Sequence, residues 1–389
     1  MNRVSILTSY WPSSENPISG IFVAYQVEAF AQLGHQVDVF VLRGRSGGVS
    51  LSPDDLALEG ADRVSVHVCK VPTLRGSGRS RNILRANVAV TSWALRLIRW
   101  PREGVVVVHG LVFAGLAVIR VPKIARRSII FVHGIDPILD TEKGRDMIRG
   151  SFSPRASETS FVEVGVTLNA YVESLGFDSL GVIGNGVRLP SDLRPAAPSR
   201  MEDEELVICC VANLTEQKGV DLLVSALGKL HAAGVSNWHL KIVGDGVERL
   251  ALAAQAKRLG VTSKITFLGR VSHRGTLRTV AESHLFVLPS RFESFGIAHM
   301  EAMSLGVPVV ATRGTGPEAF VVDGESGWLV SADDPGAIAE IVMSVLNDEV
   351  MRRAVGVNAA AKVSDMSWKR NVELTLSAIQ DSRIGSVIG

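Results

Sequence analysis

The stretch SRFESFGIAHMEAMSLGVPVV, residues 290–310, decides the fold class and holds much of the candidate chemistry. It follows the apolar run HLFVLPS, residues 284–290, which is typical of a strand, and it ends in another strand-like run. Between the two runs, a loop leads into a helix-like segment that stops at Gly306. Strand, helix and strand in succession predict a unit of an α/β fold. Glu293 lies in the loop and Glu301 in the helix, eight residues apart.

Apolar runs of the same kind recur along the whole chain, among them RVSILTS, QVDVFVL, GVVVVHG and LVICCVAN. They are continuous rather than alternating, as expected of strands that are covered on both faces of a parallel sheet. Helix-like segments separate most of them, for example at residues 22–35, 222–234 and 248–260. The alternation continues through both halves of the chain and predicts α/β, doubly wound Rossmann-like domains.

A segment without periodicity divides the two halves. Residues 188–205 are rich in Pro, Ser and charged side chains, which indicates a linker. We therefore predict a Rossmann-like domain at residues 1–187, a second one at 206–366, and a C-terminal helix at 367–389 that packs back across the domains. Doubly wound sheets bind ligands beyond the carboxyl ends of their strands, so two such domains that face each other predict an interdomain cleft.

The composition is that of an ordinary globular protein. The 389 residues include 46% hydrophobic and 21% charged residues, and the formal net charge of +2 gives no support for a nucleic-acid partner. Cys69, Cys209 and Cys210 form neither a disulfide framework nor a CxxC metal pattern, so a reducing, cytoplasmic compartment fits best. The N-terminus lacks the apolar core of a signal peptide. The apolar run at residues 104–119 is shorter than the roughly 20 residues of a spanning helix.

The two glutamates flank the predicted start of a helix, where free backbone N–H groups and partial positive charge favour a phosphate. A carboxylate accepts two hydrogen bonds at once, so Glu293 and Glu301 can each hold a vicinal diol. Ribose offers one such diol and a hexose offers another. The pattern therefore predicts a site for a nucleotide-diphosphate sugar. The alternative is that both are ordinary acidic residues favoured by the helix dipole.

Four further positions place small or charged residues in predicted loops. Lys218 follows a strand and is a good partner for phosphate, although a solvated loop lysine gives the same pattern. Gly244 begins a Gly-Asp-Gly turn that permits close backbone approach, but the turn is not the dinucleotide fingerprint. Gly20 lies in a small-residue loop after the first strand, which lets a phosphate or sugar approach the backbone. His133 ends a predicted strand, either as part of a site or as a structural histidine.

Together these motifs resemble the retaining glycosyltransferases of the GT-B fold, specifically family 4. The family's signature of Pro-Ser, Glu-x-Phe-Gly, Glu-Ala-Met and Gly-x-Pro-Val is similar to LPSRFESFGIAHMEAMSLGVPVVAT in this chain. The likeness continues in GTGPEAFVVDGESGWLV, IVGDGVERL, ITFLGRV and KGVDLLVSAL, and in the first half it covers EAFAQLGHQVDVF, FVHGID and GVIGNGV. It spans nearly the whole chain and is more specific in the second half.

The resemblance implies an acceptor-binding N-terminal domain and a C-terminal domain that binds the nucleotide sugar. Glu301 would hold the donor ribose, and Glu293 would hold the transferred sugar. Lys218 would stabilise the diphosphate leaving group, and His133 would lie beside the donor sugar. The implied catalytic residues are thus His133, Glu293 and Lys218, and the other implied donor-binding positions are Gly20, Asn213, Gly244, Arg270 and the backbone N–H groups of Phe295, Gly296 and Ile297.

One position departs from the family pattern. The family has an Arg and a Lys five residues apart that clamp the diphosphate, and Asn213 stands where the Arg is expected. Asn donates hydrogen bonds but carries no charge. Either Arg270 or Arg291 supplies that charge, or the leaving group is less well stabilised. The first-half loop is also Ser19-Gly20 rather than a pair of glycines.

The resemblance implies transfer with retention at the anomeric carbon and without a metal. Negative charge builds on the β-phosphate as the nucleoside diphosphate departs, and Lys218 and the helix start at Phe295–Ile297 would stabilise it. No Asp-x-Asp motif ends a predicted strand, and the pairs Asp54-Asp55 and Asp333-Asp334 lie in turn-like contexts. The resemblance makes Glu293 a sugar-binding residue rather than a covalent nucleophile of the retaining-glycosidase kind.

Residues 75–102 carry many arginines and no acidic residue, with Trp93, Leu97 and Trp100 among them. Basic residues beside Trp and Leu suit a helix on an anionic membrane surface. Because acceptors of such enzymes are often lipid-linked, we expect peripheral contact with the inner face of the plasma membrane. The alternative is a helix whose apolar face packs on the sheet.

The function predicted is sugar transfer from a nucleotide-diphosphate sugar to a saccharide or lipid-linked acceptor, in bacterial polysaccharide or glycoconjugate synthesis. Two alternatives share the fold. One is a catalytically weak GT-B protein that acts as a binding or scaffold component, which Asn213 favours, and the other is a nucleotide-sugar epimerase. A Rossmann dehydrogenase is disfavoured because the loop after the first strand, SYWPSSENPISG, lacks the fingerprint.

Overall fold

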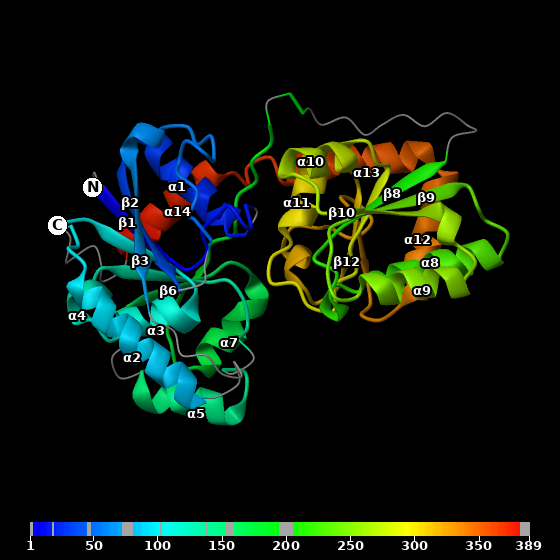
Figure 1. Cartoon of the computed structure of the whole chain (residues 1–389). Coiled ribbons are helices and arrows are strands. Elements are labelled where there is room, and N and C mark those ends of the chain that lie inside the picture. Colours follow the sequence, from blue (N-terminus) through cyan, green and yellow to red (C-terminus); the bar gives the residue numbers. More distant parts are fainter. Residues whose placement is uncertain are drawn as a thin grey trace. The chain divides into compact units, whose positions relative to one another are not determined.

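The chain divides into two compact units, which Figure 1 shows. One unit comprises Met1–Gly186 together with Ser367–Gly389, and the other comprises Val187–Met366. Of the predicted linker, residues 191 and 194–204 lie outside the described residues. The computed structural model describes residues 3–17, 19–44, 48–71, 81–101, 103–136, 139–152, 159–190, 192–193 and 205–381.

The first unit is built on a parallel sheet of seven strands in the order β3-β2-β1-β4-β5-β6-β7. The direction in which strands are added reverses between β1 and β4, as in doubly wound sheets. Every residue of β4 and β5 is buried, which explains why these strands are continuous apolar runs. The strands are β1 (Arg3–Thr8), β2 (Gln36–Arg43), β3 (Val64–Lys70), β4 (Val105–His109), β5 (Ser128–Val132), β6 (Ser160–Glu163) and β7 (Ser179–Val182).

Helices from both ends of the chain meet in this unit. Helix α14, near the C-terminus, packs against α1, near the N-terminus, and Figure 1 shows them side by side in red and blue. The chain passes closely at Gly186, where a Cβ would lie 2.2 Å from the backbone nitrogen of Trp368. Residues 382–389 lie outside the described residues. The helices are α1 (Ile21–Gln32), α2 (Arg81–Leu97), α3 (Leu116–Ile119), α4 (Pro122–Ala125), α5 (Glu142–Ser151), α7 (Asn169–Ser174) and α14 (Trp368–Asp381).

The long apolar run at residues 104–119 is divided among three elements. It forms β4, a π-helical turn at Leu111–Gly115, and the short helix α3. All four residues of α3 are buried in the unit. Among the helices in the described part of the chain, none combines the length and the apolarity needed to cross a membrane.

The second unit contains a parallel sheet of six strands in the order β10-β9-β8-β11-β12-β13. Here the direction of strand addition reverses between β8 and β11, which pair in parallel. Both sheets therefore have the doubly wound arrangement that the sequence predicts. The strands are β8 (Leu206–Val211), β9 (Trp238–Val243), β10 (Ile265–Gly269), β11 (Leu285–Val287), β12 (Val309–Thr312) and β13 (Trp328–Val330).

Helix starts in this unit differ in how they are capped. Side-chain oxygens of Ser272, Asp334 and Asp348 accept backbone N–H groups at the starts of α10, α12 and α13. Helix α11 begins at Gly296 without such a cap. Its first N–H groups therefore have no side-chain partner at the cap. The helices are α8 (Val220–Ala232), α9 (Arg249–Arg258), α10 (His273–Ala281), α11 (Ile297–Ser304), α12 (Pro335–Asn347) and α13 (Glu349–Lys362).

The Gly-Asp-Gly turn after β9 packs directly on the loop after β8. A Cβ at Gly244 would lie 1.9 Å from the carbonyl oxygen of Ala212, and one at Gly246 would lie 2.3 Å from that of Leu214. Gly244 also has a φ of 121°, outside the range that L-residues readily adopt. Close backbone packing therefore explains why glycine is required at positions 244 and 246.

We expect Gly244→Ala to destabilise the protein much more than Gly234→Ala. Both glycines have a positive φ, but a Cβ at Gly234 would meet no atom within 4 Å. The strained φ alone costs about 1–2 kcal/mol, and a backbone clash brings the loss to about 3 kcal/mol or more. Urea unfolding followed by circular dichroism measures both variants, and equal losses would contradict the packing role of Gly244.

Candidate functional site

The loops after β8 and β11 meet because their strands are neighbours in the sheet. Lys218 ends the short helical turn Glu216–Lys218 that follows β8, and Glu293 lies in the loop after β11. The loops touch at Gly219, where a Cβ would lie 2.0 Å from the carbonyl oxygen of Pro289. Residues 75 positions apart in the chain are thus brought within hydrogen-bonding distance.

Lys218 and Glu293 form an ion pair in this corner. Lys218 Nζ donates to Glu293 Oε2 at 2.7 Å, and the two side chains are 24% and 14% exposed. Partial burial removes much of the water that would screen their attraction. Lys218 Nζ has two more N–H groups and the carboxylate has a second oxygen, so the pair retains capacity to bind a polar ligand.

The start of α11 follows Glu293 closely in sequence, and a neighbouring segment holds the backbone of this loop. Gly296 has a φ of 98°, and Phe295 is buried. Gly316 N donates to Glu293 O at 2.7 Å, so the chain after β12 holds the backbone of the loop. Four N–H groups at the start of an α-helix lack an intrahelical partner. The start of α11 thus combines a fixed backbone with an electrostatic preference for an anion.

Glu301 lies on α11 and pairs with a histidine that the sequence did not single out. His273 Nε2 lies 2.7 Å from Glu301 Oε1, and the two side chains are 25% and 14% exposed. His273 is the first residue of α10, whose start is fixed by the Ser272 cap. One carboxylate oxygen of Glu301 is therefore held in place, while the other remains an acceptor.

The two arginines that could replace the charge missing at Asn213 differ in what they already bind. Asn213 is exposed and, within the described residues, its side chain makes no hydrogen bond. Arg291 donates two hydrogen bonds to Asp221 at 2.8 Å, and it also binds Asp333 and the carbonyl oxygen of Glu216 at 2.7 Å. The hydrogen bond from Arg291 lowers the pKa of the Asp221 carboxyl. The guanidinium of Arg291 is therefore committed to structural partners.

Arg270 differs from Arg291 in this respect. It follows β10 and is exposed, and no hydrogen bond or ion pair joins it to another residue in the described ranges. Arg270 is therefore the better of the two arginines to supply the charge that Asn213 lacks.

Gly20 and His133 lie at the carboxyl ends of strands in the first unit. Gly20 has a φ of 76° at the start of α1, and a Cβ there would lie 2.4 Å from the carbonyl carbon of Tyr10. His133 follows β5 and is half-buried. Its ring lies 4.7 Å from the ring of Phe22 and 6.0 Å from that of Tyr10, centre to centre. Two aromatic rings thus restrict the orientation of the His133 imidazole.

His133 also pairs with a second histidine. His109 ends β4, the neighbour of β5, and its Nδ1 lies 2.9 Å from His133 Nε2. Burial lowers the pKa of His133 to about 3, and burial together with His133 lowers the pKa of His109 well below its ordinary value. Both imidazoles are therefore neutral at physiological pH.

Asp55, Asp333 and Asp334 of the two aspartate pairs have structural partners. Asp55 Oδ2 accepts hydrogen bonds from the backbone and the hydroxyl of Ser52 in a turn. Asp333 binds Arg291, and Asp334 caps α12. Within the described ranges, no group of three or more His, Cys, Asp or Glu side chains is arranged to hold a metal ion.

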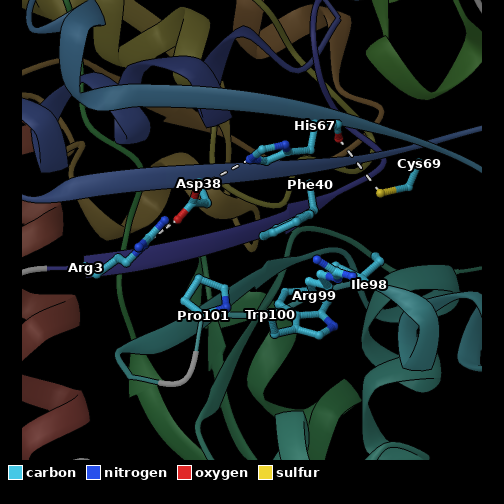
Figure 2. Close-up of a pocket in the computed structure, with 9 residues that line it drawn as sticks. All are labelled: Arg3, Asp38, Phe40, His67, Cys69, Ile98, Arg99, Trp100 and Pro101. Carbon is cyan, nitrogen blue, oxygen red and sulfur yellow. Dashed lines mark hydrogen bonds and ion pairs between the residues drawn. The ribbon is translucent and has the colours of Figure 1, made fainter.

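A separate pocket of about 440 Å³ lies in the first unit (Figure 2). Arg3 and Asp38, near the amino ends of β1 and β2, form an ion pair of 2.7 Å on its wall. Gly20 and His133 lie at the carboxyl ends of the same sheet, so this pocket is not part of the candidate site. It is lined by Arg3, Asp38, Phe40, His67, Cys69, Ile98, Arg99, Trp100 and Pro101.

Sequence reasoning missed His273 and His109. His109 did carry a signal, because Val-His-Gly ends both β4 and β5, at residues 108–110 and 132–134. Two strands that end in the same tripeptide and are neighbours in a parallel sheet place their histidines together. His273 carried no comparable pattern.

Comparison with known proteins identifies two matching family profiles. The profile described as "Glycosyl transferases group 1" matches residues 196–362, and the profile described as "Glycosyl transferase 4-like domain" matches residues 19–163. Together the two profiles cover most of the chain.

Curated relatives match a part of their own length. The GDP-mannose-dependent monoacylated alpha-(1-6)-phosphatidylinositol monomannoside mannosyltransferase of Corynebacterium glutamicum is 29% identical over 251 residues, which are 59% of this chain and 65% of that protein. A GDP-mannose-dependent alpha-(1-6)-phosphatidylinositol monomannoside mannosyltransferase of Mycolicibacterium smegmatis is 33% identical over 175 residues, 42% of this chain and 46% of that protein. The matched part thus spans less than two thirds of these relatives.

Solved structures match over nearly the whole chain. Sucrose-phosphate synthase from Thermosynechococcus elongatus has a TM-score of 0.74 at 18% identity and covers 98% of this chain and 99% of its own. HepE of Anabaena, in complex with UDP and glucose, has a TM-score of 0.68 at 19% identity and covers 97% and 100%. These similarities confirm the predicted α/β GT-B fold class.

Proposed function

Because the chain belongs to the family 4 glycosyltransferases of the GT-B fold, we propose that it transfers a sugar from a nucleotide-diphosphate sugar to a saccharide or lipid-linked acceptor, with retention at the anomeric carbon. The observation that carries the proposal is the Lys218–Glu293 ion pair beside the uncapped start of α11. A cation, free N–H groups and a carboxylate match the groups of a sugar linked to a diphosphate. We place the reaction in bacterial polysaccharide or glycoconjugate synthesis.

The leaving-group step uses charges already in place. The bond between the anomeric carbon and the β-phosphate oxygen breaks, a bond to the acceptor oxygen forms on the same face, and the departing phosphate takes the acceptor proton. Lys218 and the N–H groups of Phe295, Gly296 and Ile297 stabilise the negative charge that develops on the phosphate. These residues supply this stabilisation without a metal ion.

The carboxylates orient the donor. Glu301, held by His273, accepts hydrogen bonds from the ribose diol, and Glu293 accepts them from the hydroxyls of the transferred sugar. In the first unit, Gly20 leaves the backbone accessible to a phosphate, and His133 offers its imidazole to a hydroxyl group of a sugar. Gly244 is needed by the fold of the second unit, so we give it no contact with the donor of its own.

A second function is favoured by Asn213, which leaves the expected cation position uncharged. A GT-B protein with weak leaving-group stabilisation would bind a nucleotide sugar and serve as a binding or scaffold component. Arg270 bears on the choice between the two functions, because its exposed guanidinium has no partner among the described residues and is available to replace the missing charge.

Contact with a membrane is proposed through α2. This helix buries Leu84, Val88 and Leu95 against its unit, while Trp93 and Leu97 are 61% and 64% exposed. Exposed apolar side chains beside cations suit an anionic lipid surface, and a cytoplasmic protein would find one at the inner face of the plasma membrane. Residues 75–80 and 102 of the predicted segment lie outside the described residues. Of the arginines in this region whose side chains the structure describes, Arg85, Arg96 and Arg99 are exposed.

We expect Lys218→Ala to lower kcat for sugar transfer by about 10²–10³, with a smaller change in KM, because the lysine acts on charge that develops as the leaving group departs. Lys257→Ala, which removes an exposed lysine from α9, is the control and keeps full activity. Product formation from a panel of UDP- and GDP-sugars measures the effect. Equal rates for the two variants would refute the role of Lys218.

Arg270→Ala and Arg291→Ala are expected to fail in different ways. Arg270→Ala lowers kcat by roughly tenfold or more while the melting temperature stays unchanged, because the Arg270 charge has no partner in the described part of the chain. Arg291→Ala lowers the melting temperature, because it leaves Asp221 and Asp333 without their partner. Thermal unfolding and steady-state kinetics of both variants make the comparison. Full activity in Arg270→Ala would refute the role of Arg270, and a wild-type protein that binds a nucleotide sugar without transferring the sugar would favour the scaffold function.

Flotation with vesicles tests the membrane contact. The protein is expected to float with phosphatidylglycerol vesicles at low salt and to be released at high salt, as electrostatic adsorption requires. The pair Trp93→Ser and Leu97→Ser weakens flotation, whereas Leu250→Ser, at a residue that is 83% exposed on α9, does not. An absence of flotation at low salt would exclude the contact.

A further inference from the structure

Four side chains of the first unit, three of them buried, form a continuous series of hydrogen bonds. Asn371 of α14 binds Gln26 of α1 at 2.7 Å, Gln26 binds His109 at 2.9 Å, and His109 binds His133 at 2.9 Å. The chain is anchored at its far end by the backbone carbonyl of Gly184, 2.7 Å from Asn371 Nδ2. Asn371, Gln26 and His109 are each at most 3% exposed. Buried polar groups of this kind must find partners within the protein.

The anchor fixes the direction of every hydrogen bond in the chain. A carbonyl oxygen only accepts, so the atom of Asn371 that faces Gly184 is the amide NH2 group. Asn371 Oδ1 then accepts from Gln26 Nε2, which turns Gln26 Oε1 towards His109 Nε2. The reverse orientation of the Gln26 amide would place two acceptor oxygens against each other, with neither satisfied.

The same reasoning assigns the tautomers of the two imidazoles. Gln26 Oε1 only accepts, so the proton of neutral His109 lies on Nε2 and its Nδ1 carries a lone pair. His133 Nε2 must then donate to His109 Nδ1, and the other nitrogen of neutral His133, Nδ1, carries a lone pair. Within the described residues no further hydrogen bond is formed by His133.

We propose that Asn371 and Gln26 are positioning residues that act through His109 to hold His133 in its Nε2–H tautomer, so that His133 offers Nδ1 as a hydrogen-bond acceptor to a hydroxyl group of the bound sugar. A ring nitrogen with a lone pair accepts from a hydroxyl and cannot donate to a carboxylate. This selects neutral sugars over acidic ones at the group that His133 contacts. The identity of the ligand rests on the proposed function, whereas the tautomer does not.

The tautomer is measured on the full chain labelled with 15N-histidine, by long-range 1H–15N correlation at pH 7. Signals are assigned with His133→Gln and His109→Gln. We expect the wild type to show His133 and His109 protonated on Nε2 alone. A wild-type His133 protonated on Nδ1, or a mixture of tautomers, overturns the proposal without any need for a variant.

Gln26→Leu tests whether Gln26 sets the tautomer of His133 through His109. It removes the acceptor for His109 Nε2, so neither tautomer of His109 is favoured and His133 is expected to show both forms. Gln32→Leu makes the same replacement on the same helix at an exposed glutamine bound to Glu59, and it keeps the wild-type spectrum. A single unchanged His133 tautomer in a folded Gln26→Leu protein would overturn the role of the chain.

Kinetics connect the tautomer to recognition. With UDP-glucose or GDP-mannose, whichever is turned over, kcat/KM of Gln26→Leu falls by about tenfold, the equivalent of one hydrogen bond. Gln32→Leu retains the wild-type value. If no sugar is transferred at all, the proposed function fails while the tautomer measurement stands. If transfer is normal but His133 is protonated on Nδ1, the inference fails and the proposed function stands.

Discussion

The pairing of β8 with β11 is the constraint on which the candidate site of the second unit depends. Parallel strands present their carboxyl ends at one edge, so this single adjacency brings the Lys218 loop against the Glu293 loop. Gly219 lets the backbones of these two loops approach closely, and Gly316 lets the chain after β12 pack against the backbone of Phe295. The ion pair then sits beside a helix start without a side-chain cap, so a carboxylate, a cation and free N–H groups share one corner.

Local patterns in the sequence were sufficient for the fold class and for the site-bearing loops, because continuous apolar runs and helix stops are local properties. The same local patterns were not sufficient to predict which side chains interact with each other. Lys218 and Glu293 were each identified, but their pairing depends on strand order, which no local pattern encodes. Likewise, Arg291 and Arg270 look equivalent in sequence, and only the contacts with Asp221 and Asp333 separate them. Polar residues that the fold buries, such as Gln26, gave no signal of their role.

The two units use buried polarity in different ways. In the second unit the charged side chains of the site remain partly exposed, which suits a ligand that brings its own charge and exchanges with water. In the first unit a neutral chain of amides and imidazoles is nearly sealed, and burial keeps its histidines uncharged. A buried series of neutral hydrogen bonds has one arrangement in which every group is satisfied. Such a series fixes the direction of each hydrogen bond without placing a charge in the unit.

The first unit is discontinuous in sequence, since it contains both residues 1–186 and the helix that begins at Trp368. Helix α14 is synthesised after the whole of the second unit, whereas its packing partner α1 is synthesised before that unit. The second unit, in contrast, is contiguous and complete before α14 emerges. During synthesis, therefore, the second unit has all of its chain available while the first still lacks a covering helix. Synthesis of the first unit therefore begins before that of the second unit but is completed after it.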